Sequence, residues 1–133
     1  MNGEELAQHM MDQRGGREEP SWTWMAHMDP EFMEAYNYLA QRAFGYHADG
    51  SVDPSALPPK TKELIAIGIL AGQRDWDRLP GHLQRLMDLG ATDREILDAL
   101  QTSATITGGP AMRMGIAVLQ ELRQAAESPV GDA

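Results

Sequence analysis

Apolar side chains recur at helical spacing along most of the chain, and few segments show the alternation that is typical of strands. Residues 3–14 form the first predicted helix, with Leu6 and Met10 on one side. A second predicted helix begins at Pro30, which suits a first helical turn after Asp29 as the N-cap. The apolar positions of this second helix are Phe32, Tyr36, Leu39 and Ala43.

A third predicted helix covers about residues 59–72 and is apolar around nearly its whole circumference, which predicts a buried helix. An amphipathic helix follows, and Gly90 can end it as a C′ glycine. Thr92 then caps the next helix, with Glu95 completing a capping box. The last long helix opens at Pro110. The pattern therefore predicts an all-α fold.

The stretch "RGGREEP" breaks the first predicted helix, so residues 1–20 are expected to form an N-terminal arm. Residues 21–126 then form the helical domain, and "ESPVGDA" at 127–133 is expected to be a disordered tail. Two helices of the domain are more apolar than a lone small bundle requires. This surplus predicts a homo-oligomer that buries it.

Composition narrows the class of protein. The formal net charge is −9 and the pI is near 4.7, so nucleic acid is not an expected partner. The N-terminus lacks the apolar core of a signal peptide, and the longest apolar run is too short to span a bilayer. A cytoplasmic protein without a membrane partner is expected. The absence of cysteine excludes disulfides, thiolate metal sites and thiol chemistry.

Three stretches, "LPPKTKELIAIGILAG", "GHLQRLMDLGATDREILDAL" and "GGPAM", together resemble the carboxymuconolactone decarboxylase family, which includes the alkyl hydroperoxidase D-like proteins. The resemblance covers about residues 57–122. It implies an alkyl hydroperoxidase D-like bundle of about six helices, built around a helical hairpin and assembled as a homotrimer or homohexamer. The implied oligomer agrees with the surplus of apolar surface.

The family resemblance implies two chemistries. The peroxidase branch uses a glutamate, a C-x-x-C pair and a histidine, which fall here on Glu63, Asp75, Arg78 and His82. A carboxylate and a guanidinium cannot carry out thiol–disulfide exchange, because that reaction needs a thiolate. The resemblance therefore favours the other branch, a cofactor-independent decarboxylase of carboxylated lactones. Non-catalytic binding of a small molecule by the same fold is the alternative, and isomerisation, hydration or lactone opening remain open as reactions.

Two residues are predicted to be catalytic. His82 can donate or accept a proton near neutral pH, and decarboxylation leaves an enolate that must be protonated at carbon. Glu63, placed by the sequence in the first turn of the apolar helix, would assist His82; the alternative role is to complement the helix dipole.

Four further residues are predicted to bind substrate. Arg78 can hold a carboxylate in bidentate fashion, although it can also pair with Asp75. Trp76 can cover the pocket or pack against a neighbour. Gly109 lies at a helix start, where backbone N–H groups can face an anion. The alternative is that it only separates two consecutive helices.

No metal site is expected, because the histidines are scattered and form no close pair. Several aromatic residues can line a cavity for the ligand or belong to the core. These are Trp22, Trp24, Tyr36, Tyr46 and His47.

Overall fold

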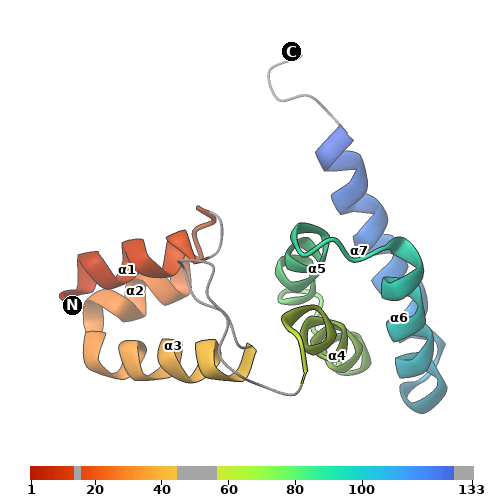
Figure 1. Ribbon diagram of the computed structural model, residues 1–133, viewed down its shortest axis with the longest axis horizontal. Coiled ribbons are helices and arrows are strands. Elements are labelled where there is room, and N and C mark those ends of the chain that lie inside the picture. The colour runs from red at the N-terminus through yellow and green to blue at the C-terminus, as the bar shows by residue number, and fades with distance from the viewer. Residues whose placement is uncertain (14–15, 45–56, 128–133) are drawn as a thin grey trace. The chain divides into compact units, whose positions relative to one another are not determined.

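The computed structural model describes residues 1–13, 16–44 and 57–127, and all of its regular structure in these ranges is helical. The described residues form seven α-helices, which confirms the all-α prediction (Figure 1). The chain divides into two compact units, Met1–Ala56 and Leu57–Ala133. Within the described ranges, no helix is both long and apolar enough to cross a membrane.

The first unit contains α1 (Gly3–Asp12), α2 (Pro20–Met28) and α3 (Pro30–Phe44). The side chains of Asn2 and Glu5 form a capping box at the start of α1. Helix α1, which lies within the predicted N-terminal arm of residues 1–20, packs against α2 and α3. The core of the unit consists of Leu6, Ala7, Met10, Ala26 and Met33.

Helix α3 begins as the sequence predicts, because the Asp29 carboxylate accepts the N–H of Phe32 at 3.1 Å. The apolar positions expected on it are largely exposed, with Phe32 at 58% and Leu39 at 64%. The buried face carries Met33 and Asn37 instead, since α1 and α2 contact α3 on that side. Asn37 is tolerated there because its amide donates to the side chain of Gln13 at 2.9 Å.

None of the described aromatic residues of this unit is fully buried. Trp22 is half-buried and meets Tyr36 edge to face, with ring centroids 5.8 Å apart, whereas Trp24 is exposed. Tyr46 and His47 lie outside the described residues.

The tight contact between α1 and α2 gives a test of this unit. A Cβ atom on Gly3 would lie 2.7 Å from the carbonyl oxygen of Ala26 and 2.9 Å from Cα of His27. Both are backbone atoms, so Gly3→Ala is expected to lower the free energy of unfolding by about 1–3 kcal/mol. Urea unfolding followed by circular dichroism measures this. The control is Gly81→Ala, where a Cβ meets nothing within 4 Å. Equal stability of the two variants would contradict the close approach.

The second unit contains α4 (Pro59–Gly72), α5 (Leu79–Asp88), α6 (Asp93–Thr107) and α7 (Gly109–Glu127). Helix α4 contacts the three others, and α6 packs along α7 (Figure 1). The core of the unit lies between these helices. Its fully buried large apolar residues are Ile67, Leu79, Leu83, Leu86, Ile96 and Leu100.

The turn between α5 and α6 follows the sequence signals. Gly90 has φ +78°, and its N–H and that of Ala91 donate to the carbonyls of Met87 and Leu86 at the end of α5. Thr92 and Glu95 then form the predicted capping box. Hydrogen bonds from the backbone N–H of Thr92 and from Lys60 lower the pKa of Glu95.

Helix α4 is not buried around its whole circumference. Ile67 is fully buried, but Ile65 is 49% and Ile69 53% exposed, and both line a groove between α4 and α6. The boundaries of α4 match the predicted range of about residues 59–72. The prediction that the helix is buried on nearly all sides is wrong for a single copy of the chain.

Candidate functional site

A short charged turn connects α4 to α5 and sets where α5 begins. The carboxylate of Asp75 accepts the backbone N–H of Arg78 at 3.1 Å, and the Asp75 carbonyl accepts the N–H of Leu79 at 3.2 Å. Pro80 lies in the first turn of α5, where its missing N–H costs nothing. His82 therefore lies at the end of this first turn, on the helix that packs against α4.

Glu63 is completely buried, with 0% of its surface exposed, and its side chain meets α5. Its Oε2 lies 2.6 Å from Nδ1 of His82, and its Oε1 lies 3.6 Å from Nη1 of Arg85. No acidic residue occupies the first turn of α4, and Glu63, the fifth residue of the helix, lies just beyond that turn. Its position is explained by two basic partners on α5 rather than by the helix dipole.

The contact between Glu63 and His82 constrains both side chains. An ionised carboxylate only accepts hydrogen bonds, so an ionised Glu63 would accept from Nδ1–H of His82. That arrangement would orient the imidazole ring and leave Nε2 for proton exchange. The side chain of His82 is 25% exposed, which leaves it within reach of a small molecule from solvent. The pair therefore places a partly exposed imidazole beside a buried carboxylate, and its catalytic role stays a prediction.

Sequence reasoning missed Arg85. It follows His82 by three residues on an amphipathic helix, so the two side chains point to the same side of α5. That spacing could have indicated that Arg85 lies beside His82. Glu63, His82 and Arg85 are called the buried carboxylate cluster below.

Arg78 and Asp75 form a separate, more exposed pair. Nε of Arg78 lies 2.5 Å from Oδ2 of Asp75, and the Arg78 side chain is 60% exposed. The hydrogen bond from the Arg78 side chain, followed by that from its backbone N–H, lowers the pKa of Asp75. The alternative pairing raised by the sequence is thus present, and carboxylate binding by Arg78 stays a prediction.

The two other expected substrate contacts occupy different surroundings. Trp76 is half-buried and packs against the core of the second unit, in line with its packing role. Gly109 is the first residue of α7 and is exposed. Their roles in substrate binding stay predictions.

A groove of about 710 Å³ runs between α4 and α6. Its α4 wall is formed by residues such as Ile65, Gly68 and Ile69, whereas Glu63 points to α5 on another side of α4. The groove and the buried carboxylate cluster are therefore distinct features. Among the described residues, no group of three or more His, Asp or Glu side chains is arranged to hold a metal ion.

Comparison with known sequences decides the family. The profile of the Carboxymuconolactone decarboxylase family matches residues 30–121, well over half of the chain. The chain belongs to the carboxymuconolactone decarboxylase family. The match includes α3 of the first unit as well as α4, α5 and α6. No curated protein matches the chain significantly.

Two solved structures have the same fold. A carboxymuconolactone decarboxylase family protein from Legionella pneumophila is 23% identical, with a TM-score of 0.68, over 94% of this chain and 97% of its own. A candidate carboxymuconolactone decarboxylase from Burkholderia xenovorans is 22% identical, with a TM-score of 0.71, over 95% of this chain and 96% of its own. At this identity the likeness shows the fold of this chain alone. That fold is the one that the family resemblance implied.

Proposed function

We propose that the chain is a cofactor-independent enzyme that decarboxylates a small carboxylated lactone or keto acid by acid–base proton transfer. The observation that carries this proposal is the 2.6 Å contact between the fully buried carboxylate of Glu63 and Nδ1 of His82. A buried carboxylate that orients a partly exposed histidine is a common arrangement for proton transfer. Membership of the family supports the choice of reaction.

The proposed reaction has two steps. The bond between the substrate carbon and its carboxylate breaks, CO₂ leaves, and the electron pair stays on carbon as an enolate. The protonated His82 then donates its Nε2 proton to that carbon, and the neutral imidazole regains a proton from solvent. The net change consumes one proton and releases one CO₂ for each substrate molecule.

Glu63 and Arg85 serve as positioning residues in this scheme. Glu63 holds His82 through Nδ1, so that Nε2 is the nitrogen that exchanges a proton with the substrate. Arg85 lies beside the other oxygen of Glu63, so the buried carboxylate has basic partners on both of its oxygens. Both partners come from α5, so the contacts hold the two side chains on the same face of that helix.

Arg78 is proposed to bind the substrate carboxylate. It precedes His82 by four residues, one helical turn, so a substrate held at His82 lies within reach of its guanidinium. Replacement of Arg78 by glutamine is expected to raise KM about three- to tenfold with little change in kcat, because a binding contact is lost. Steady-state kinetics measure both constants. An unchanged KM would remove Arg78 from the proposed substrate site.

The function is tested with the wild-type chain and carboxymuconolactone, alongside a panel of small β-keto acids. We expect CO₂ to appear in step with loss of one substrate, and, in D₂O, one deuterium on the carbon that carried the carboxylate. Deuterium reports the protonation step directly. Absence of turnover with every compound would contradict the proposed reaction.

The same panel addresses the binding alternative. A ligand that binds only the folded chain raises its melting temperature. A compound that stabilises the chain without releasing CO₂ would favour a small-molecule binding protein over a decarboxylase.

A further inference from the structure

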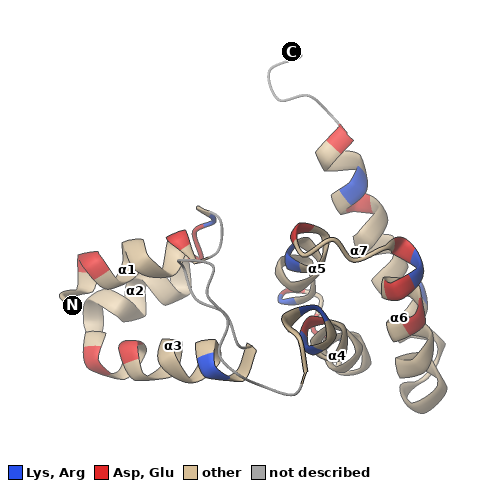
Figure 2. Cartoon of the chain, viewed as in Figure 1, with Lys and Arg blue, Asp and Glu red and all other residues tan. Residues whose placement is uncertain are grey.

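The turn between α4 and α5 concentrates charge next to a segment that has none. Residues 74–78 contain two arginines and two aspartates, whereas residues 64–73, which complete α4 and its C-cap, contain no charged side chain (Figure 2). Asp75 and Arg78 contact each other through two separate hydrogen bonds. The geometry of these two bonds bears on how Arg78 binds a carboxylate.

The two oxygens of Asp75 accept different groups of Arg78. Oδ1 accepts the backbone N–H of Arg78 at 3.1 Å, and Oδ2 accepts Nε–H of its side chain at 2.5 Å. These hydrogen bonds lower the pKa of Asp75, so its carboxylate is ionised at neutral pH. The first bond fixes the carboxylate relative to the backbone of the turn. The second bond therefore holds the guanidinium against a group that is itself fixed.

The contact with Asp75 occupies only one edge of the guanidinium. Within the described part of the chain, Nη1 and Nη2 of Arg78 make no hydrogen bond, and the side chain is 60% exposed. These two nitrogens can bind a carboxylate through two parallel hydrogen bonds. Side chains of a helix lean toward its N-terminus, so His82 is directed toward the end of α5 at which Arg78 is the N-cap.

An ion pair as exposed as this one contributes little to stability. Its larger effect is on the freedom of the arginine. A long side chain that is ordered only when its ligand arrives lowers the affinity, because the lost rotamer entropy is charged to binding. The guanidinium of Arg78 is already held before a ligand is bound.

We propose that Asp75 is a positioning residue, which holds Arg78 through Nε so that Nη1 and Nη2 receive the carboxylate of the substrate. Asp75 then acts through Arg78 and does not touch the substrate, since two carboxylates repel each other. The inference rests on the proposed function for the assignment of Arg78 as the substrate-binding residue.

The variant Asp75→Asn separates the two hydrogen bonds. The asparagine oxygen can still accept the backbone N–H of Arg78, but the NH₂ group cannot accept from Nε–H. We expect KM, and the dissociation constant of carboxymuconolactone or a β-keto acid measured by calorimetry, to rise about two- to fivefold with kcat little changed. ¹⁵N relaxation of Nε should show that Arg78 becomes more mobile on the picosecond to nanosecond timescale.

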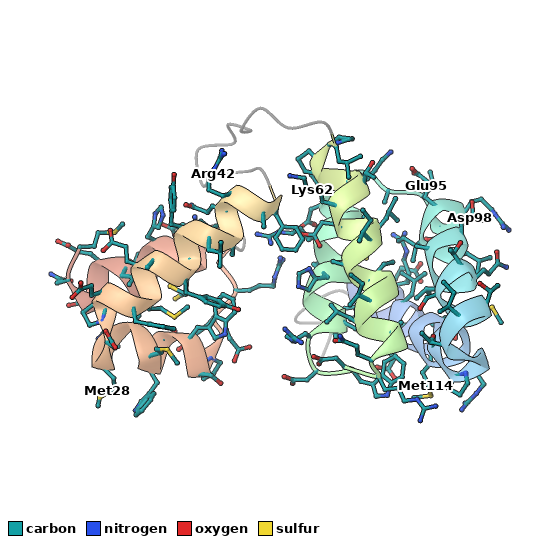
Figure 3. The ribbon with its side chains drawn as sticks, turned by 90° about the horizontal axis from the view of Figure 1, so that it is seen from below. Met28, Arg42, Lys62, Glu95, Asp98 and Met114 are labelled. Atoms are coloured by element: carbon teal, nitrogen blue, oxygen red, sulfur yellow. The ribbon has the colours of Figure 1, made fainter. Side chains whose placement is uncertain are left out.

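A double-mutant cycle identifies the route of the effect. If Asp75 acts through Arg78, Asp75→Asn has no further effect on binding in the Arg78→Gln background. The matched control is Asp98→Asn, because Asp98 of α6 forms a similar exposed pair with Arg94 at 2.5 Å (Figure 3). This control should keep the wild-type KM, the wild-type dissociation constant and the Nε signal of Arg78.

Binding that is unchanged or tighter in Asp75→Asn would overturn the inference, as would the same weakening in the Arg78→Gln background. An Nε signal that does not change would also overturn it. Turnover by the wild type together with any of these results contradicts the role of Asp75 alone. Weaker carboxylate binding and a mobile Arg78 in Asp75→Asn, in a chain that releases no CO₂, would support this role and contradict the proposed reaction alone.

Discussion

Replacement of His82 by alanine is expected to lower kcat for CO₂ release by about 10²- to 10⁴-fold, the usual contribution of a positioned general acid. The imidazole is the group oriented by Glu63, and alanine leaves no proton donor at that place. KM should change less than kcat, because the proton is transferred after the substrate has bound. Steady-state kinetics of CO₂ release, with deuterium incorporation in D₂O, measure the effect.

Loss of stability must be separated from loss of chemistry in this variant. His82 is partly exposed, so its truncation removes little core packing, and the melting temperature should fall only slightly. His27→Ala provides a matched control, since His27 is exposed on α2 and should leave kcat unchanged. Equal rates for the His82 variant and the wild type would remove His82 from the mechanism.

Glu63→Gln is expected to reduce kcat about 100-fold or more while the chain stays folded. Glutamine has nearly the same shape, but its amide N–H can donate to Nδ1, which favours the wrong tautomer of His82. The buried site also loses a charged hydrogen bond, at a cost of about 1–3 kcal/mol in the free energy of unfolding. Kinetics, urea unfolding and ¹⁵N NMR of the imidazole measure these three effects.

The NMR measurement distinguishes positioning from simple stabilisation. A merely structural role of Glu63 would reduce stability but leave the tautomer of His82 and the rate per folded molecule unchanged. Glu121→Gln, on the exposed side of α7, is the control and should match the wild type in all three measurements. An active Glu63→Gln variant with an unaltered histidine signal would contradict the proposed role.

The helix boundaries were largely predictable because the signals that set them are local. Asp29, Gly90 and Thr92 act within a few residues of the helix ends that they define, and the structure places each as predicted. Helix α2 was missed, since its aromatic and methionine residues lack a clear apolar face and Ala26 alone is buried in it. Propensity and periodicity give no strong signal for such a segment.

Which side of a helix is buried depends on the neighbouring helices, and sequence reasoning erred most on this point. In α3 the buried positions are Met33 and Asn37 rather than the expected aromatic ones. In α4 the apolar surface continues past the core onto Ile65 and Ile69, which face the groove. The spacing of apolar residues along these two helices does not show which of the apolar positions are buried. That depends on how the neighbouring helices pack.

The sequence alone determined the all-α class, most helix ends, the exclusion of thiol chemistry and, through the family resemblance, the choice of Glu63 and His82. These follow from residue type and from short-range spacing. Only the tertiary structure showed that Glu63 meets His82 and Arg85, and that Arg78 contacts Asp75. Contacts between side chains on different helices depend on how those helices pack, and no short stretch of sequence encodes that distance or direction.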